Sequence, residues 1–216
     1  RHYAAAGHHL ILCARRETPL AELAQGCQKA GACAVTAKSI DVSDAQAMRD
    51  WLIAQDKATP IDLVIANAGI SGGTGGSGDG EDETQARRIF AINLDGVFNT
   101  IHPLLPRMRE RGRGQIALMS SLAAFSGWAG APAYSASKAA VRIYGEALRG
   151  ACAPSGVAVN VILPGFVRTP MTDVNPYPMP FLMDESQAAQ RIAAGLRRNT
   201  ARIAFPWPMY GFAYLI

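Results

Sequence analysis

Short runs of Val, Ile and Leu alternate along this chain with longer stretches in which apolar residues recur at helical spacing. Such alternation is typical of a parallel sheet that is covered by helices on both faces. We therefore expect a doubly wound, three-layer α/β/α architecture. The predicted strands are His9–Ala14, Ala32–Ile40, Ile61–Ala66, Gln115–Ser120, Ala158–Leu163 and Arg202–Phe205.

Two helices are expected between the first three strands. The first spans Thr18–Gly31, because Thr18 precedes a proline that suits the first turn of a helix and Gly31 is a common helix end. Ser43 opens the second, since a serine with Gln46 three positions later fits a capping box. The apolar residues of the second helix fall on one face and should pack on the sheet; they are Met48, Trp51 and Leu52.

A third helical stretch spans about Thr84–Arg109, and another helix begins near Pro132. Proline lacks the N–H that a helix interior needs, so Pro103 and Pro106 should kink the third helix or end it early. The glycine-rich stretch Gly69–Glu83 lacks the Gly-Lys-Ser/Thr ending of a phosphate-binding P-loop. We favour a flexible, solvated connection there over a mobile cover on a substrate pocket.

The 216 residues suit one well-packed domain that spans the whole chain, 1–216. Arg1–Gly7 has the pattern of a helix end that leads directly into a strand. A doubly wound nucleotide-binding fold begins with a strand and a glycine-rich turn ahead of that helix, so we expect about 20 residues to be missing there. We also expect the chain to be incomplete at its apolar end, Met209–Ile216, which fits the first turns of a helix, a subunit contact or a membrane-touching segment. The membrane contact is not favoured.

No metal site or disulfide framework is expected. The cysteines have unrelated spacings and no histidine at ligand distance, so we interpret all four as small buried residues: Cys13, Cys27, Cys33 and Cys152. No apolar stretch approaches the ~20 residues of a membrane-spanning helix, and the N-terminus lacks the layout of a secretory signal, so we expect a cytoplasmic protein. The net charge of +4 comes partly from arginines around Gly112, but no aromatic residues interleave with them to stack bases, so nucleic-acid binding is not expected.

A tyrosine and a lysine four residues apart carry the most specific chemical signal. On a helix, Tyr134 and Lys138 lie on the same face, so their side chains can meet. A free phenol has a pKa near about 10, and an adjacent ammonium lowers that pKa by stabilising the phenolate, which tunes the phenol for general acid–base catalysis. The spacing alone is common by chance, and would usually mean a half-buried tyrosine beside a surface lysine.

Other motifs in the chain change that interpretation. Ser121 follows a predicted strand thirteen residues before Tyr134, where side chains emerge at the carboxyl edge of the sheet. With its other motifs, the chain resembles the classical short-chain dehydrogenase/reductase family over essentially its whole length, which implies an oxidoreductase on a Rossmann-like sheet. The motifs that carry the resemblance are Asn67-Ala68-Gly69, Asn93, Ser121, Tyr134 with Lys138, and Pro164-Gly165 followed by Thr169.

The resemblance implies a role for each catalytic position. Tyr134 would protonate the carbonyl oxygen in reduction, or accept the proton in alcohol oxidation. Lys138 would lower the pKa of Tyr134 and hydrogen-bond the nicotinamide ribose, and Ser121 would donate a hydrogen bond to the substrate oxygen. Asn93 would hold a water that links Lys138 to solvent, and a polar Asn inside a helix is otherwise an unfavourable choice.

Cofactor contacts follow in the same way. The strand His9–Ala14 ends without the acidic residue that NAD-preferring enzymes use, and Arg15 or Arg16 can fork onto a 2′-phosphate. We therefore predict NADP(H) over NAD(H), with Arg15 the favoured contact. Asp41 and Val42 would lie against the adenine, although Asp41 also fits a simple turn at a strand end. The other implied contacts are Asn67, Ala68 and Gly69 on the adenosine side, and Pro164, Gly165, Val167 and Thr169 around the nicotinamide, together with Tyr134 and Lys138.

We predict a carbonyl reductase or alcohol dehydrogenase that moves hydride between the nicotinamide and a ketone or secondary alcohol of lipophilic character. An epimerase or dehydratase shares the Tyr and Lys pair but needs an added substrate domain. The main alternative is a catalytically silent NADP-binding sensor or scaffold protein, although such proteins often lose the tyrosine or serine. The resemblance implies a homodimer or homotetramer.

The predicted substrate pocket combines an irregular lid, Met171–Met183, with apolar residues near the catalytic motifs. Phe125 and Trp128 are equally compatible with a structural role, packing the turn before the catalytic helix. The pocket residues are Leu122, Phe125, Trp128 and Phe166.

Overall fold

The structure is a computed structural model of the chain, and it describes residues 1–72, 81–173 and 178–215. All strand pairings in it are parallel. They form a two-stranded sheet, β1–β2, and a four-stranded sheet in the order β3–β4–β5–β6. The strands are β1 (His9–Ala14), β2 (Ala34–Ser39), β3 (Leu63–Ala66), β4 (Gly114–Met119), β5 (Val157–Pro164) and β6 (Arg202–Phe205).

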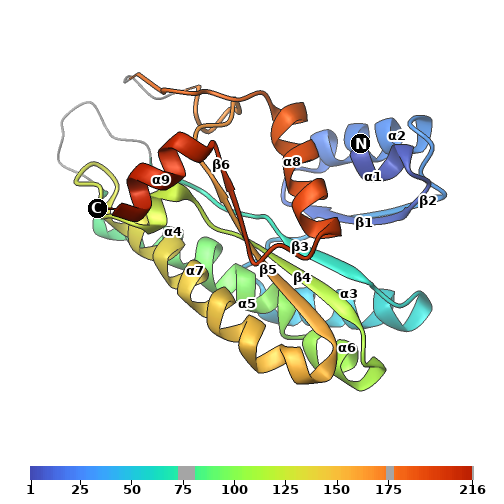
Figure 1. Cartoon of the computed structure of the whole chain (residues 1–216). Coiled ribbons are helices and arrows are strands. Elements are labelled where there is room, and N and C mark those ends of the chain that lie inside the picture. The colour runs from blue at the N-terminus through green and yellow to red at the C-terminus, as the bar shows by residue number, and fades with distance from the viewer. Residues whose placement is uncertain (73–80, 174–177, 216) are drawn as a thin grey trace.

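Helices cover both faces of the strands (Figure 1). The helices α3, α5, α6 and α7 lie on one face of the four-stranded sheet, and α8 lies on the other face together with α1 and α2. This arrangement confirms the predicted Rossmann-like α/β fold with parallel strands. The helices are α1 (His2–Ala5), α2 (Glu17–Lys29), α3 (Ala45–Ala58), α4 (Glu83–Phe90), α5 (Gly96–Ile101), α6 (Leu105–Arg111), α7 (Pro132–Cys152), α8 (Glu185–Arg197) and α9 (Trp207–Leu215), with the short turns η1 (Ala91–Asp95), η2 (Leu122–Ala124) and η3 (Ala153–Ser155).

Most element ends agree with the sequence. β1 and β6 have the predicted bounds, and the other strands differ by one or two residues at an end. The capping box that we expected at Ser43 is wrong. Asp44 caps α3 instead, and its side chain accepts a hydrogen bond from the Ala47 N–H at 2.9 Å. The Ser43 hydroxyl is not available as a cap, because it donates to Asp41 at 2.8 Å.

The third helical stretch breaks where its prolines predict. α4, η1 and α5 run continuously to Ile101, and α6 starts at Leu105. Pro103 falls in the break, and Pro106 falls in the first turn of α6, where a missing N–H does no harm. The sequence did not predict the π-helical turn η1 in the middle of this stretch.

The two sheets stand apart. In the part of the chain that the structure describes, no strand lies between β1 and β3. A hollow of about 360 Å³ is lined there by residues of α1, β3, β4 and α8, among them Tyr3, Leu63 and Leu196. The expected first strand and glycine-rich turn ahead of Arg1 stay a prediction.

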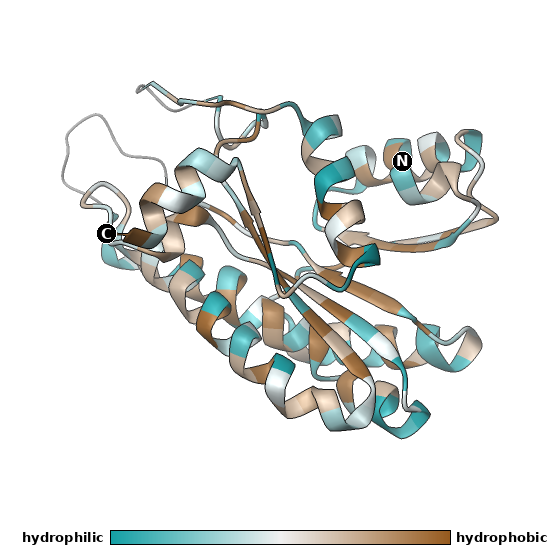
Figure 2. Cartoon of the chain, in the orientation of Figure 1, coloured by the Kyte–Doolittle hydropathy of each residue, from teal (hydrophilic) through white to brown (hydrophobic). Residues whose placement is uncertain are grey.

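The main core lies between the four-stranded sheet and the helices α3, α5 and α7. Most residues in the strands of this sheet are hydrophobic (Figure 2). The apolar stripe predicted for α3 is confirmed, since Met48, Trp51 and Leu52 are all buried. Cys27 and Cys152 are buried as expected, but Cys33 is exposed, because it lies in the turn that follows α2.

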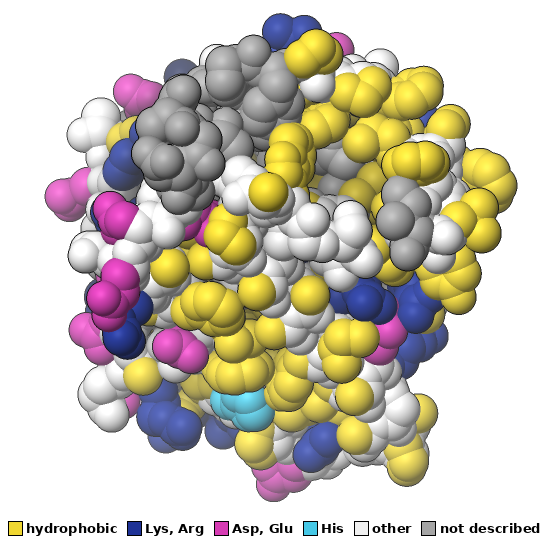
Figure 3. Space-filling view, turned by 90° about the vertical axis from the view of Figure 1, so that its left-hand side faces the viewer, with side chains coloured by type: hydrophobic (Ala, Val, Ile, Leu, Met, Phe, Trp, Pro, Cys, Tyr) yellow, Lys and Arg dark blue, Asp and Glu magenta, His cyan; other side chains and the backbone are white. Residues whose placement is uncertain are grey.

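The helix α9 is apolar around its whole circumference, but only one of its faces packs on β6 and η2. Phe125 contacts Tyr210 and Tyr214 of α9 edge-on, with ring centroids 5.7 and 6.1 Å apart. Its other large side chains, including Trp207 and Phe212, are mostly exposed. Figure 3 views the molecule from the side where α9 ends, and hydrophobic side chains cover much of that face. No helix of the described residues is long and apolar enough to cross a membrane.

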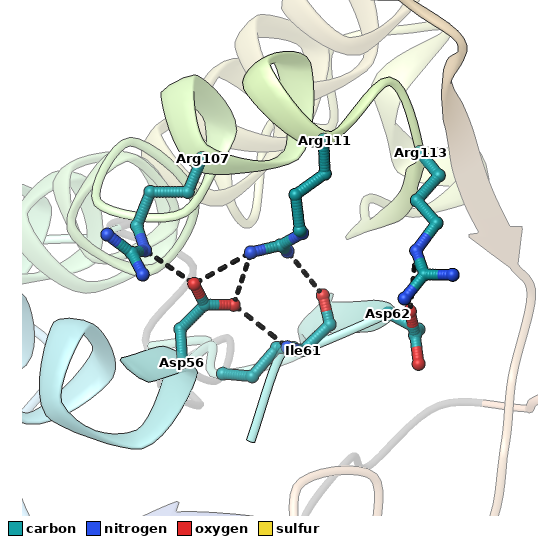
Figure 4. A network of polar contacts seen from close by, with 6 residues as sticks. All are labelled: Asp56, Ile61, Asp62, Arg107, Arg111 and Arg113. Carbon is teal, nitrogen blue, oxygen red and sulfur yellow. Dashed lines mark hydrogen bonds and ion pairs between the residues drawn. The ribbon is translucent and has the colours of Figure 1, made fainter. Parts of the chain in front are cut away.

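The arginines around Gly112 form an internal tie (Figure 4). Arg107 and Arg111 both bind the Asp56 carboxylate, which is fully buried at the end of α3. The Ile61 N–H donates to the same carboxylate at 2.8 Å, and Arg111 donates to the Ile61 carbonyl at 3.0 Å. Burial raises the pKa of Asp56, but these hydrogen bonds outweigh it and hold the pKa below its usual value. This cluster therefore joins α3 to α6 as a structural unit.

Candidate active site

The catalytic pair predicted from the sequence lies on α7, at the carboxyl edge of the four-stranded sheet. Tyr134 is half-buried in the first turn of α7, and Lys138 lies one turn further on with only 4% of its surface exposed. The Lys138 ammonium is 5.7 Å from the centroid of the Tyr134 ring, so the two side chains do meet. It also donates a hydrogen bond to the Met119 carbonyl at the end of β4, at 3.0 Å.

Burial has a direct consequence for the Lys138 ammonium. Removing the charge from water lowers the pKa of Lys138 from 10.5 to about 8. The space beside it is kept open by a glycine: a Cβ at Gly69 would lie 3.2 Å from Lys138 Nζ and 3.4 Å from Asn93 Oδ1. Gly69, Asn93 and Lys138, which come from three separate motifs, therefore meet at one point.

Ser121 follows β4 with one residue, Ser120, between them, and so lies just beyond the strand end as predicted. Its hydroxyl accepts a hydrogen bond from the Ala123 N–H at 3.1 Å and caps the short turn η2, which packs against α7. The preceding Ser120 was not predicted to matter. Its buried hydroxyl donates to the Lys138 carbonyl at 2.7 Å, so it fixes α7 to the end of β4. The two adjacent serines therefore have different partners: Ser120 binds the Lys138 carbonyl, and Ser121 caps η2. Successive residues of an extended segment point to opposite sides.

Asn93 is fully buried in the π-helical turn η1. Its amide accepts from the Ile70 N–H at 2.8 Å and donates to the Ile70 carbonyl at 2.9 Å and to the Ser137 hydroxyl at 3.1 Å. A π-helical turn inside a helix often marks a functional site. Here it turns the amide toward the segment after β3 and toward α7. Ile70 and Ser137 were not predicted as partners, because neither carries a sequence signal of its own.

Of the residues predicted to contact the adenosine, Arg15 and Asp41 lie together. The Arg15 guanidinium is 3.7 Å from the Asp41 carboxylate, and both side chains are about two-fifths exposed. Hydrogen bonds from the Ser43 N–H and hydroxyl lower the pKa of Asp41. Arg16 is exposed one residue further on. The Val42 side chain is buried in the core against Gly96, and its predicted place against the adenine stays a prediction.

Among the residues predicted around the nicotinamide, Pro164 is the last residue of β5, and the Gly165 N–H donates to the Phe205 carbonyl at 2.7 Å. A Cβ at Gly165 would lie 2.9 Å from Pro206, just ahead of α9. Val167 and Met183 form a parallel bridge that closes the base of the segment between them. Thr169 lies in a tight turn, where its N–H donates to the Thr172 hydroxyl at 2.9 Å.

Two of the predicted pocket residues, Leu122 and Phe125, are packed inside the protein, whereas Trp128 and Phe166 are partly exposed. Leu122 is buried against Leu163 of β5 and belongs to the core. Phe125 is held between α9 and Arg142, whose guanidinium lies 4.5 Å from the ring centroid, which matches its structural alternative. Trp128 is 41% exposed and Phe166 is half-buried beside Gly165.

The described residues of the lid, 171–173 and 178–183, are irregular as predicted. The predicted flexible loop falls mainly on residues 73–80, outside the described residues.

The short chain dehydrogenase model matches residues 1–177 of the chain. The chain belongs to this family. Short chain dehydrogenase relatives match nearly all of it: an uncharacterized oxidoreductase of Myxococcus xanthus is 38% identical over 204 residues, which are 94% of this chain and 79% of the relative. As an oxidoreductase of this family, the chain is an NAD(P)-dependent dehydrogenase or reductase.

Two solved structures of short chain dehydrogenases extend the comparison. A short-chain dehydrogenase of Sphingobium yanoikuyae in complex with NADPH is 25% identical, with a TM-score of 0.85 over 95% of this chain and 81% of that chain. A 3-oxoacyl-[acyl-carrier protein] reductase of Brucella melitensis with bound NAD is 26% identical, with a TM-score of 0.77 over 94% and 82%. Proteins similar to this chain therefore bind nicotinamide cofactors in both the phosphorylated and the unphosphorylated form.

Proposed function

We propose that the protein transfers hydride between NADP(H) and a ketone or secondary alcohol, with Tyr134 as the proton donor and acceptor. One observation carries the proposal. The buried Lys138 ammonium lies 5.7 Å from the centroid of the Tyr134 ring, on a helix that packs against the short turn η2, which Ser121 caps. A phenol beside an ammonium exchanges protons more readily than a free phenol, because the positive charge stabilises the phenolate.

Each side chain has one task in this mechanism. In carbonyl reduction, the Tyr134 hydroxyl gives its proton to the substrate oxygen as that oxygen gains negative charge. The Ser121 hydroxyl donates a hydrogen bond to the same oxygen and stabilises the developing charge. Lys138 would stabilise the phenolate through its positive charge and would hydrogen-bond the ribose of the bound cofactor. Asn93 holds a water that returns the proton to Tyr134 through Lys138. In alcohol oxidation, each proton moves the opposite way.

The residues present fit a nicotinamide dinucleotide. The missing side chain at Gly69 leaves room next to the Lys138 ammonium, where a ribose hydroxyl finds a donor. When bound, the nicotinamide supplies or accepts the hydride. The adenosine half would be held by Asp41, Val42, Asn67 and Ala68. The nicotinamide half would be held by Pro164, Gly165, Val167 and Thr169, and the Thr169 hydroxyl could supply a hydrogen bond to the carboxamide.

The test of this mechanism is Tyr134→Phe, which removes only the hydroxyl. We expect kcat/KM for ketone reduction to fall by about a thousandfold, within the ordinary range for loss of a general acid. Tyr144→Phe is the matched control, because Tyr144 lies on the same helix with its hydroxyl bonded to His102, 3.1 Å away. Ketone reduction by Tyr134→Phe at the wild-type rate would sink the proposal.

Arg15 is the proposed basis of a preference for NADP(H). It lies after β1, and its ion pair with Asp41 at 3.7 Å is a solvent-exposed contact that a 2′-phosphate, to which the guanidinium can fork, would replace. Arg15→Ala should weaken NADPH binding by roughly ten- to a hundredfold and leave NADH binding unchanged. Calorimetric titration with both cofactors measures these affinities. Arg113→Ala is the control, because Arg113 pairs with Asp62 away from the site. Equal wild-type affinities for NADPH and NADH would exclude the preference.

A lipophilic ketone or alcohol is the proposed substrate class. The apolar side chains around the site support it: Trp128, Phe166, and in the lid Met171 and Phe181, the last two being 40% and 59% exposed. Reduction of a series of ketones of increasing apolar surface, followed by NADPH oxidation, tests it. We expect kcat/KM to rise along the series, and a flat or falling trend would contradict this class.

We propose a homodimer or homotetramer as the assembled form. Exposed apolar side chains on α4 and α7, Phe90 at 37% and Ile143 at 55%, support a subunit contact. Light scattering of the purified protein measures the mass directly. Ile143→Asp should lower it, and a monomer at micromolar concentration would contradict the proposal.

A further inference from the structure

The first turn of α7 is capped from outside the helix. The first N–H groups of a helix lack partners within it, and the residue before α7, Ala131, has no side chain that could accept from them. Two of these groups donate instead to Glu81, about fifty residues earlier in the chain. The Ala133 N–H donates to Glu81 Oε2, and the Tyr134 N–H lies 3.2 Å from Oε1 and 3.3 Å from Oε2. The Glu81 carboxylate therefore accepts a hydrogen bond from the backbone of Tyr134, the proposed proton donor.

Glu81 is fixed in space by its neighbours. The next residue, Asp82, caps α4 and accepts from the Gln85 N–H at 2.7 Å. The Gln85 side chain donates to the Gly72 carbonyl at 2.7 Å, so the two ends of the glycine-rich stretch are tied at the start of α4. Because α4 continues through η1, the element that holds Glu81 is also the element that carries Asn93.

The two members of the catalytic pair are thus anchored separately. Lys138 is held by β4, through the Met119 carbonyl and through the Ser120 hydroxyl on its own carbonyl. Tyr134 lies one turn nearer the helix end, where a helix frays most readily when its N–H groups lose their acceptors. A negative charge at this end also suits the helix dipole. Loss of Glu81 would therefore loosen the backbone of Tyr134 while Lys138 stays in place.

We propose that Glu81 is a positioning residue, which holds the Tyr134 phenol in register with Lys138 and Ser121. The proposal rests on the proposed function, because it assumes that Tyr134 is the proton donor. It gives Glu81, near the end of the glycine-rich stretch Gly69–Glu83, a role that acts through the backbone of Tyr134.

Glu81→Ala, Glu81→Gln and Glu81→Asp test it, with Glu83→Gln as the matched control. Glu83 is two residues away and 78% exposed, and among the described residues its one ion pair is with Arg87 on its own helix. Three quantities are measured for each variant: the melting temperature, kcat and KM for ketone reduction across pH, and the pKa of Tyr134 in the cofactor-free protein. That pKa comes from the tyrosinate absorbance, taken as the difference from Tyr134→Phe.

For Glu81→Ala we expect kcat to fall about tenfold, KM to change less than twofold, and the pKa of Tyr134 to rise toward its ordinary value of about 10. Glu81→Gln keeps an acceptor oxygen at the same reach and should retain most of kcat. Glu81→Asp is one methylene shorter and should lose part of it. Glu83→Gln should match the wild type in all three quantities.

A lower melting temperature with unchanged kcat and unchanged Tyr134 pKa in Glu81→Ala would overturn the proposal and leave Glu81 as a structural cap. If Glu81→Ala does not fold, Glu81→Asp decides: wild-type kcat and Tyr134 pKa in that variant would equally overturn it. Failure of the proposed function is recognised separately, because Tyr134→Phe would then stay active whatever the Glu81 variants do.

Discussion

At one edge of the four-stranded sheet the Asp56 carboxylate is fully buried between Arg107 and Arg111, whereas at the opposite edge the buried Lys138 ammonium bonds to the Met119 carbonyl. Among the described residues, no carboxylate lies within ion-pair distance of Lys138. Asp56, in contrast, receives hydrogen bonds from two guanidinium groups and from the Ile61 N–H. The two edges therefore differ in whether a buried charge is compensated.

The pKa values follow that difference. Burial raises the pKa of Asp56, yet its partners bring the value below normal, so Asp56 stays ionised near neutral pH. Burial alone lowers the pKa of Lys138 to about 8, close to neutral pH, where the group exchanges protons easily. A compensated charge holds the fold together, and an uncompensated one is available for chemistry.

The largest effect is expected from Lys138→Met, which removes the uncompensated charge. Turnover of ketone and NADPH should fall by about a thousandfold or more, because the Tyr134 phenolate would lose the positive charge beside it. The cofactor-free variant should nevertheless be more stable than the wild type, since burying an ammonium costs free energy. Steady-state kinetics and urea denaturation check both. A variant that is both inactive and less stable would break the comparison, because Lys138 would then also be a structural group.

The next largest effect is expected from Asp56→Asn at the compensated edge. The two arginines lose their counter-charge, so the free energy of unfolding should fall by about 3–5 kcal/mol. Turnover per folded molecule should stay at the wild-type value. Urea denaturation measures the loss, and Asp62→Asn serves as control, because Asp62 is 75% exposed in its pair with Arg113 and should cost less than about 1 kcal/mol. A similar loss for both variants would show that burial does not set the strength of this tie.

The pH dependence of stability sharpens the comparison further. Below pH 8 the folded and unfolded states both carry the Lys138 proton, and the full cost of the buried charge is present. Between pH 8 and the unfolded pKa of about 10.4, the unfolded state binds more protons, so stability rises with pH. Relative to Lys138→Met, the free energy of unfolding of the cofactor-free wild type should gain about 3 kcal/mol over this range. Parallel curves for the two proteins would contradict the lowered pKa.

The smallest effect is expected from an exposed carboxylate. Asp44 caps α3 through one hydrogen bond to the Ala47 N–H at 2.9 Å. Asp44→Ala should lower the free energy of unfolding by about 1 kcal/mol, the ordinary value for a helix cap, with no change in turnover. Thermal unfolding checks it. A loss as large as that of Asp56→Asn would mean that exposure does not separate these carboxylates.

The sequence predicted the features that local pattern determines. The apolar runs set the bounds of β1 and β6, the prolines set the break at Pro103, and helix geometry alone brings Tyr134 and Lys138 to one face. Each of these depends on residues within a few positions of one another, so no knowledge of the tertiary structure is needed.

What the sequence did not predict depends on partners far along the chain. The π-helical turn at Asn93 is stabilised by Ile70 and Ser137, 23 and 44 residues away. In the sequence, Glu81 is one of several acidic residues near the end of the glycine-rich stretch. Only the folded structure shows that the N-terminus of α7 lies beside it. Ser43 fits a capping box by spacing, but Asp41 competes for its hydroxyl and only the folded turn shows which contact forms.

Gly69 has a consequence for how this enzyme tolerates change. Its backbone is not in the left-handed region, so any amino acid could adopt its conformation, in contrast to Gly112 and Gly156. An added methyl group would meet the end of the flexible Lys138 side chain at 3.2 Å, which yields with a shift of a few tenths of an ångström. Gly69→Ala should therefore pass a selection for folded, protease-resistant protein and fail a selection for turnover. Libraries screened for heat resistance alone would accumulate such silent losses at this position.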